Sequence, residues 1–153
     1  MQIHASVRSS AASHEVRVST DGRASSVPVP GREGGGSSLN GGELLCAALA
    51  TCYCNDVYRE AGRRGLVVRA VVVEVEAEFG GRGEPARRIT YTAQVESDAP
   101  AEAIAALLRE TDAVAEVQNT LRAGLAVELR IAPDAGALLH TAREAAKAQP
   151  FRE

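Results

Sequence analysis

Apolar and polar residues alternate over the first thirty positions in the way that a β-strand with one buried face requires. The alternation covers residues 2–8, 15–20 and 24–29. Between the last two segments lies Asp21-Gly22, a dipeptide typical of tight hairpin turns. We therefore predict a small antiparallel sheet at the start of the chain.

The longest apolar pattern belongs to a helix that we predict from Asn40 to Gly65. Asn40 is a good N-cap and Glu43 lies three residues later, as a capping box requires, while Gly65 suits the C-terminal end. Residues 44–54 carry no charge on any face, whereas residues 55–64 are rich in charged side chains. A helix that is apolar all round is buried on all sides. We expect its first half to lie deep in the molecule, with help from a partner subunit, and its second half to reach water.

The rest of the chain continues a mixed pattern of strands and helices. The predicted elements are a strand over 66–79, a strand over 88–96, a helix opened by Pro100, a helix from about Asp112 to Arg122, a strand over 125–131 and a tail helix over 135–148. With 153 residues and no long linker, the chain is expected to form a single α+β domain over 1–153.

Composition and charge exclude several classes of function. Aromatic residues make up 3% of the chain, the formal net charge is −3 and the pI is about 5.7, which argues against a nucleic-acid partner. No apolar run approaches the roughly 20 residues that span a membrane, so we expect a cytoplasmic protein with no membrane partner. The glycine-rich run 34–36 lacks a following Gly-Lys-Ser/Thr, so we expect no nucleotide and no other cofactor.

Three cysteines, Cys46, Cys52 and Cys54, lie within nine residues of the predicted helix. Helical spacing puts Cys52, Asp56 and Arg59 on one face, where Arg59 would lower the thiol pKa and Asp56 would raise it. Cys54 points roughly 200° away from Cys52, which precludes a disulfide between them without unwinding the helix. The spacing lacks the paired ligand sets of zinc motifs, so we expect no metal. All three thiols also fit small buried core residues.

The segment 40–52, Asn-Gly-Gly-Glu-Leu-Leu-Cys-Ala-Ala-Leu-Ala-Thr-Cys, resembles the central-helix motif of the OsmC/Ohr superfamily, the osmotically inducible and organic hydroperoxide resistance proteins. The similarity extends over about residues 30–131, with Asn119-Thr120-Leu121-Arg122 similar to the end of the second motif of the family, and leaves 132–153 as the tail. It implies an OsmC-like fold, in which antiparallel sheets wrap around a buried central helix in an intertwined homodimer.

The resemblance also implies a chemistry. Peroxidase members reduce organic hydroperoxides with two cysteines, an Arg and a Glu, and Cys52 matches the first cysteine. Ala115 stands where the second cysteine is usual, so Cys54 or an external thiol reductant would have to resolve Cys52. The family Glu falls on Gly42, with Glu43 one position later as the candidate orienting carboxylate. The thiolate partner would be one of the N-terminal arginines, which are Arg8, Arg17, Arg23 and Arg32.

Two other functions fit the same sequence. One is a non-catalytic dimer that binds a small hydrophobic molecule in its interface pocket, which the missing second cysteine and the shifted Glu favour. The other is a thiol redox sensor, in which Cys52 or Cys54 forms an intersubunit or mixed disulfide. The leading hypothesis remains a cysteine-based peroxidase that acts through Cys52.

Overall fold

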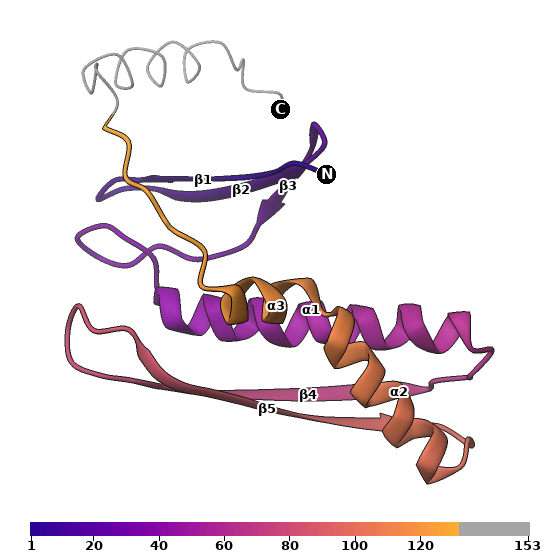
Figure 1. Cartoon of the computed structure of the whole chain (residues 1–153). Coiled ribbons are helices and arrows are strands. Elements are labelled where there is room, and N and C mark those ends of the chain that lie inside the picture. The colour runs from indigo at the N-terminus through magenta and orange to yellow at the C-terminus, as the bar shows by residue number, and fades with distance from the viewer. Residues whose placement is uncertain (132–153) are drawn as a thin grey trace, which may run out of the picture. The chain divides into compact units, whose positions relative to one another are not determined.

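The computed structural model describes residues 1–131 and has the expected mixture of helices and antiparallel strands (Figure 1). Its elements are β1 (Ile3–Ser9), β2 (His14–Thr20), β3 (Arg23–Val27), α1 (Gly41–Arg63), β4 (Ala70–Phe79), β5 (Ala86–Glu96), α2 (Ala101–Val114) and α3 (Glu116–Ala123). One compact unit spans Met1–Ala123, and a second unit begins at Gly124. The expectation of a single domain over 1–153 stays a prediction.

The predicted N-terminal sheet is present, with strand order β1-β2-β3 and antiparallel pairing throughout. Val7 lies opposite Val16, and Val16 lies opposite Val27, which gives the sheet one apolar row. Asp21 and Gly22 both have positive φ angles, 47° and 83°, as a tight two-residue hairpin turn requires. The turn that the sequence predicted is therefore confirmed.

A two-stranded sheet, β4 and β5, packs against the long helix α1. Along β4 the side chains alternate between half-buried and exposed, with Val73 inward and Glu74 outward. The strand begins at Ala70, four residues later than predicted, and β5 begins at Ala86, two residues earlier. The late start of β4 has a local cause, because the backbone N–H of Leu66 donates to the Ala61 carbonyl and closes the end of the helix.

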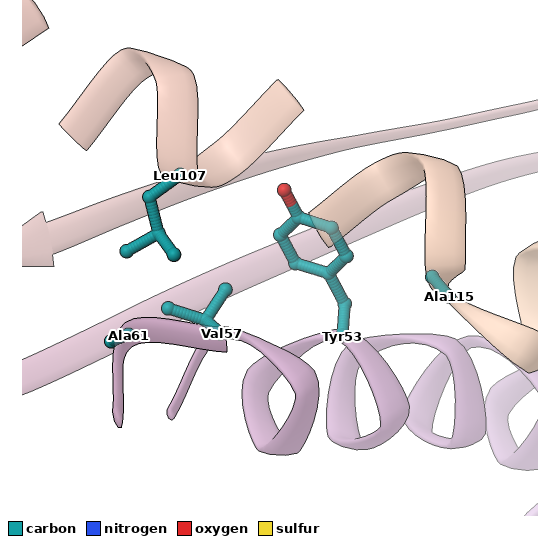
Figure 2. Packing of buried hydrophobic residues seen from close by; sticks show 5 residues of the cluster. All are labelled: Tyr53, Val57, Ala61, Leu107 and Ala115. Carbon is teal, nitrogen blue, oxygen red and sulfur yellow. The ribbon is translucent and has the colours of Figure 1, made fainter. Parts of the chain in front are cut away.

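The hydrophobic core lies between α1, the β4–β5 sheet and the two following helices. Tyr53, Val57 and Ala61 of α1 face Leu107 of α2 and Ala115 (Figure 2). The expected helix boundary at about Asp112 is wrong, since α2 continues to Val114. Ala115 has an extended backbone (φ −72°, ψ 107°) and separates the two helices, while Asp112 lies within α2 and its side chain binds Tyr91 and Arg122.

Within residues 1–131 of one subunit, the first half of α1 is not buried on all sides, and its burial by a partner subunit stays a prediction. The buried residues of α1 are Leu49, Tyr53, Asp56, Val57 and Ala61, which form one stripe. Leu44 and the neighbouring alanines on the opposite side are exposed. Only one side of the helix has β4, α2 and α3 to pack against, so within residues 1–131 the apolar residues of the other side have no cover.

The predicted strand over 125–131 is also corrected, because these residues have no regular secondary structure. Their large apolar side chains are exposed, and a strand forms only where another strand accepts its backbone hydrogen bonds. The predicted tail helix over 135–148, like all of 132–153, lies outside the described residues. In the part of the chain from 1 to 131, no helix is long and apolar enough to cross a membrane.

Candidate functional site

The middle of α1 brings together the three side chains that helical spacing placed on one face. Cys52 Sγ donates a hydrogen bond to Asp56 Oδ2 over 3.5 Å. Asp56 Oδ1 accepts from Arg59 Nη1 at 2.6 Å. The expected alignment of Cys52, Asp56 and Arg59 is therefore confirmed, and Asp56 lies between the other two.

Asp56 decides the electrostatics of the thiol. Burial raises the pKa of Cys52, and the negative charge of Asp56 raises it further, while a hydrogen bond from the backbone of Val117 lowers it. The sequence left open whether Arg59 or Asp56 prevails. Because the guanidinium of Arg59 pairs with Asp56 and Glu60, the carboxylate is the group that acts on the sulfur. Burial and the neighbouring carboxylate thus both favour the protonated thiol.

The carboxylate of Asp56 is itself in an unusual environment, since the residue is only 2% exposed. Burial raises the pKa of Asp56, and the charge of Arg59 lowers it. A buried charge is tolerated only where it is paired and hydrogen-bonded. Arg59 therefore stabilises the ionised form of a carboxylate that lies against the thiol.

The start of α3 completes the surroundings of Cys52. Glu116 lies near Arg59, with 3.9 Å between its Oε1 and Nη1 of the arginine. One donor atom each of Cys52, Asp56 and Glu116 lies within 4.8 Å of the others. Three such donors are an arrangement that metal ions use, but the guanidinium of Arg59 already supplies a positive charge to both carboxylates. That cation disfavours a divalent ion at this place.

Glu43, the predicted orienting carboxylate, is held at the beginning of α1. Its Oε2 accepts from the backbone N–H of Asn40 at 2.6 Å, and its own N–H donates to Asn40 Oδ1 at 2.9 Å. The predicted capping box is thus confirmed. At Gly42, where the family Glu would fall, an added Cβ would lie 3.1 Å from a ring carbon of Phe79. Phe79 of β4 fills the space that a longer side chain would need there.

The other two cysteines are separate from Cys52, and all three thiols are free. Cys54 lines an open hollow of about 260 Å³ on another side of α1, together with Ala50, Thr51, Asn55 and Val73. Cys46 is half-buried and lies six residues, about 1.7 turns, before Cys52. Free thiols at Cys52 and Cys54 agree with their opposed directions on the helix.

The remaining predicted site residues are Ala115 and the N-terminal arginines. Ala115, which replaces the second cysteine, is fully buried in the core. Arg17 pairs with Glu15 at 2.8 Å, and Arg32 Nε donates to the Gly35 carbonyl at 3.3 Å. These arginines thus have partners within their own segments.

Sequence reasoning missed the contribution of α3. Glu116 and the backbone of Val117 act on Cys52, and the Gln118 side chain donates to the Leu49 carbonyl of α1 at 3.1 Å. The signal in the sequence was the second motif of the family, because its cysteine position falls on Ala115, directly before these residues.

Comparison with known proteins gives a consistent family. The sequence model described as OsmC-like protein matches residues 34–130. No curated protein matches the chain. Among solved structures, an OsmC-like protein from Mycoplasma pneumoniae is similar, with a TM-score of 0.56 and 13% identity over 78% of this chain and 87% of that one.

Two further solved structures share the fold. The organic hydroperoxide resistance protein OsmC from Legionella pneumophila has a TM-score of 0.54 and 17% identity, over 80% of this chain and 90% of that one. An OsmC-like protein of unknown function from Vibrio cholerae has a TM-score of 0.50 and 14% identity, over 76% and 92% of the two chains. At these identities the likeness concerns the fold.

Proposed function

The chain belongs to the OsmC-like protein family, and from this premise we propose that it reduces organic hydroperoxides through the thiol of Cys52. The observation that carries the proposal is the hydrogen bond from Cys52 Sγ to Asp56 on the central helix. A thiol of this kind is half-buried, protonated at rest and next to a group that can accept its proton. The name of the Legionella pneumophila relative supports the same substrate class.

The proposed reaction is the two-electron oxidation of one sulfur. The sulfur attacks the distal peroxide oxygen, an S–O bond forms while the O–O bond breaks, and the products are a sulfenic acid and an alcohol. Since Ala115 offers no thiol, a second reductant must return the sulfur to its reduced state. We propose an external thiol from the cytoplasm, with Cys54 as the internal alternative.

We also propose that the working form is a homodimer. The exposed side of α1 includes Leu44, and a second copy of the chain is the partner that would cover it, as the family resemblance implies. A partner that also covers the half-buried Cys52 would exclude water from the reacting sulfur and favour an apolar hydroperoxide.

The test is a short pulse of substoichiometric cumene hydroperoxide, with a sulfenic-acid trap present, followed by intact-mass and peptide mass spectrometry. We expect the trap on Cys52 and on neither of the other cysteines. The Cys52→Ser protein should consume no peroxide, while Cys54→Ser, the matched control, should form the sulfenic acid as fast as the wild type. Unchanged peroxide consumption by Cys52→Ser would rule out the mechanism.

A second candidate function is a non-catalytic protein that binds a small hydrophobic molecule. Two residues favour it: Ala115 has a methyl group where the second cysteine is usual, and Gly42 stands where the family Glu would fall. A hydrophobic ligand that copurifies with the protein, together with three cysteines that stay reduced under peroxide, would support it.

A third candidate is a thiol redox sensor, which the position of Cys54 in an open hollow favours. Its signature would be an oxidant-dependent dimer band on a non-reducing gel that disappears in Cys54→Ser. If Cys52→Ser removes the band instead, the intersubunit disulfide belongs to Cys52.

A further inference from the structure

The two oxygens of the Asp56 carboxylate have different partners. Oδ1 accepts from Arg59 Nη1 at 2.6 Å, and Oδ2 accepts from Cys52 Sγ at 3.5 Å. The first contact is a charge-assisted bond that holds the carboxylate in place. The second leaves the other oxygen directed at the thiol proton. The side chain is thus oriented by one group while it contacts another.

The burial of Asp56 indicates that this arrangement is more than an ion pair on a helix surface. Its neighbours in the buried stripe of α1 are Tyr53 and Val57, and an apolar residue at position 56 would extend that stripe. A buried carboxylate has to recover its lost hydration from specific partners. Here these partners are a guanidinium and the thiol that we propose to react.

We propose that Asp56 is the proton carrier of Cys52: its carboxylate takes the proton from the sulfur as the sulfur attacks the peroxide, and it returns that proton to the departing alkoxide. The inference rests on the proposed hydroperoxide reduction. The S–O bond forms and the O–O bond breaks, the sulfur loses two electrons and the peroxide gains them. The thiol proton ends on the alcohol, and Asp56 is ionised before and after the step.

The charged groups around this pair determine how it should respond to pH. Asp56 and Arg59 act at the site from α1, and Glu116 acts on Cys52 from α3. The phenol of Tyr53 donates to the Leu108 carbonyl, and the charge of Asp56 contributes to its raised pKa. A carboxylate beside a thiol makes the thiolate rarer, so it slows any reaction that needs only a thiolate. It accelerates a reaction in which a proton must also reach the leaving group. The two kinds of reaction therefore separate the role of Asp56 as a charge from its role as a proton carrier.

The experiment compares alkylation with peroxide reduction in the full-length protein and in Asp56→Asn. Alkylation by iodoacetamide needs the thiolate, and its iodide leaving group takes no proton. Rates of both reactions at Cys52 are measured from about pH 5 to about pH 10, with Cys46→Ser and Cys54→Ser in the background. We expect Asp56→Asn to shift the alkylation profile to lower pH and to lower the rate with cumene hydroperoxide by about 100-fold.

Glu116→Gln is the matched control, because it removes one nearby carboxylate charge without removing the acceptor of the thiol proton. In that variant both rates should change in the same direction, by less than about threefold, as screened charges near a surface do. If Asp56→Asn lowers or raises both rates together, Asp56 acts through structure or charge alone and the proposal is overturned. Unchanged rates in Asp56→Asn overturn it as well.

The reaction of the wild type with peroxide distinguishes failure of the proposed function from failure of the role proposed for Asp56. If the wild type does not react with peroxide, the proposed function fails and the return of the proton to an alkoxide fails with it. The alkylation profile then decides the remaining point: a shift in Asp56→Asn that exceeds the shift in Glu116→Gln supports Asp56 as the partner of the thiol proton, and a shift no larger than that of Glu116→Gln refutes it. If circular dichroism shows that Asp56→Asn is unfolded, Arg59→Gln replaces it. Without the guanidinium the pKa of Asp56 rises, so the peroxide profile should move to higher pH, and an unmoved profile overturns the proposal.

Discussion

At the scale of single residues, the buried Tyr53 and the half-buried Tyr91 form the main polar contacts of the core. The hydroxyl of Tyr53 donates to the Leu108 carbonyl at 2.6 Å, and its ring meets that of Tyr91 edge to face, with 4.9 Å between the ring centroids. The hydroxyl of Tyr91 donates to Asp112, which also pairs with Arg122 at 2.7 Å. Burial raises the pKa of Tyr53 to about 12, with the charges of Asp112 and Asp56 adding to the shift.

A pH dependence follows for Tyr53. Its pKa in the folded protein lies above the unfolded value near 10, so its contribution to stability is complete below about pH 10 and is lost as the pH rises toward about 12. We expect the free energy of unfolding in urea to fall over this window. In Tyr53→Phe the free energy of unfolding should fall less steeply with pH. At neutral pH it should be about 1 kcal/mol lower than in the wild type, which is the typical contribution of one hydrogen bond. The exposed Tyr58→Phe is the control, and equal slopes in Tyr53→Phe and the wild type would contradict the assignment.

The element that matters most is α1, because it carries all three cysteines and the buried stripe. Its start is fixed by the reciprocal bonds of Asn40 and Glu43, and its end by Gly65, whose φ of +67° suits a residue without a side chain. Both ends are local in sequence. The rotation of the helix that puts Cys52 near α3 depends instead on the packing of Val57 and Leu107 in the core.

The cap gives a prediction at the same scale. Asn40→Ala removes the acceptor of the Glu43 N–H and should lower the free energy of unfolding by about 1 kcal/mol. Asn40→Ser keeps an acceptor and should differ from the wild type by only a few tenths of a kcal/mol. Thermal unfolding followed by far-UV circular dichroism measures both. A stable Asn40→Ala protein would show that tertiary packing, rather than the cap, fixes where α1 begins.

At the scale of the whole molecule, the segment 125–131 carries the strongest sign of association. Val127 is 99% exposed and Leu129 is 87% exposed, while Glu128 and Arg130 alternate with them. A strand pattern with a solvent-exposed apolar row indicates a surface that another chain covers. Since the resemblance implies a homodimer, a second copy is the partner that we propose.

Replacement of that apolar row should weaken the dimer. We expect the wild type to sediment as a dimer at micromolar concentration and the Val127→Lys/Leu129→Lys double variant to dissociate at least tenfold more readily, because buried charges at an interface are costly. Glu128→Lys changes the charge on the alternate face and should leave the dissociation constant unchanged within about twofold. A monomeric wild type in analytical ultracentrifugation would refute the homodimer.

The sequence predicted the features that depend on neighbours along the chain. The Asp21-Gly22 turn, the cap of α1, its length and the alternation of β4 and β5 all follow from the local preferences of the backbone and from hydrophobic periodicity. The motif around Cys52 also identified the family, which the match over residues 34–130 shows. Local spacing was enough to place Cys52, Asp56 and Arg59 on one face.

Tertiary structure decided what that local information leaves open. The sequence placed opposing charges near Cys52. Only the fold shows that Asp56 contacts the thiol and that Arg59 pairs with Asp56, because burial and rotamer choice depend on what packs against the helix. It also added α3 to the site and moved the helix break to Ala115. For residues 125–131 periodicity predicted a strand that this chain does not form, since hydrogen bonds between strands need a partner that a sequence pattern cannot supply.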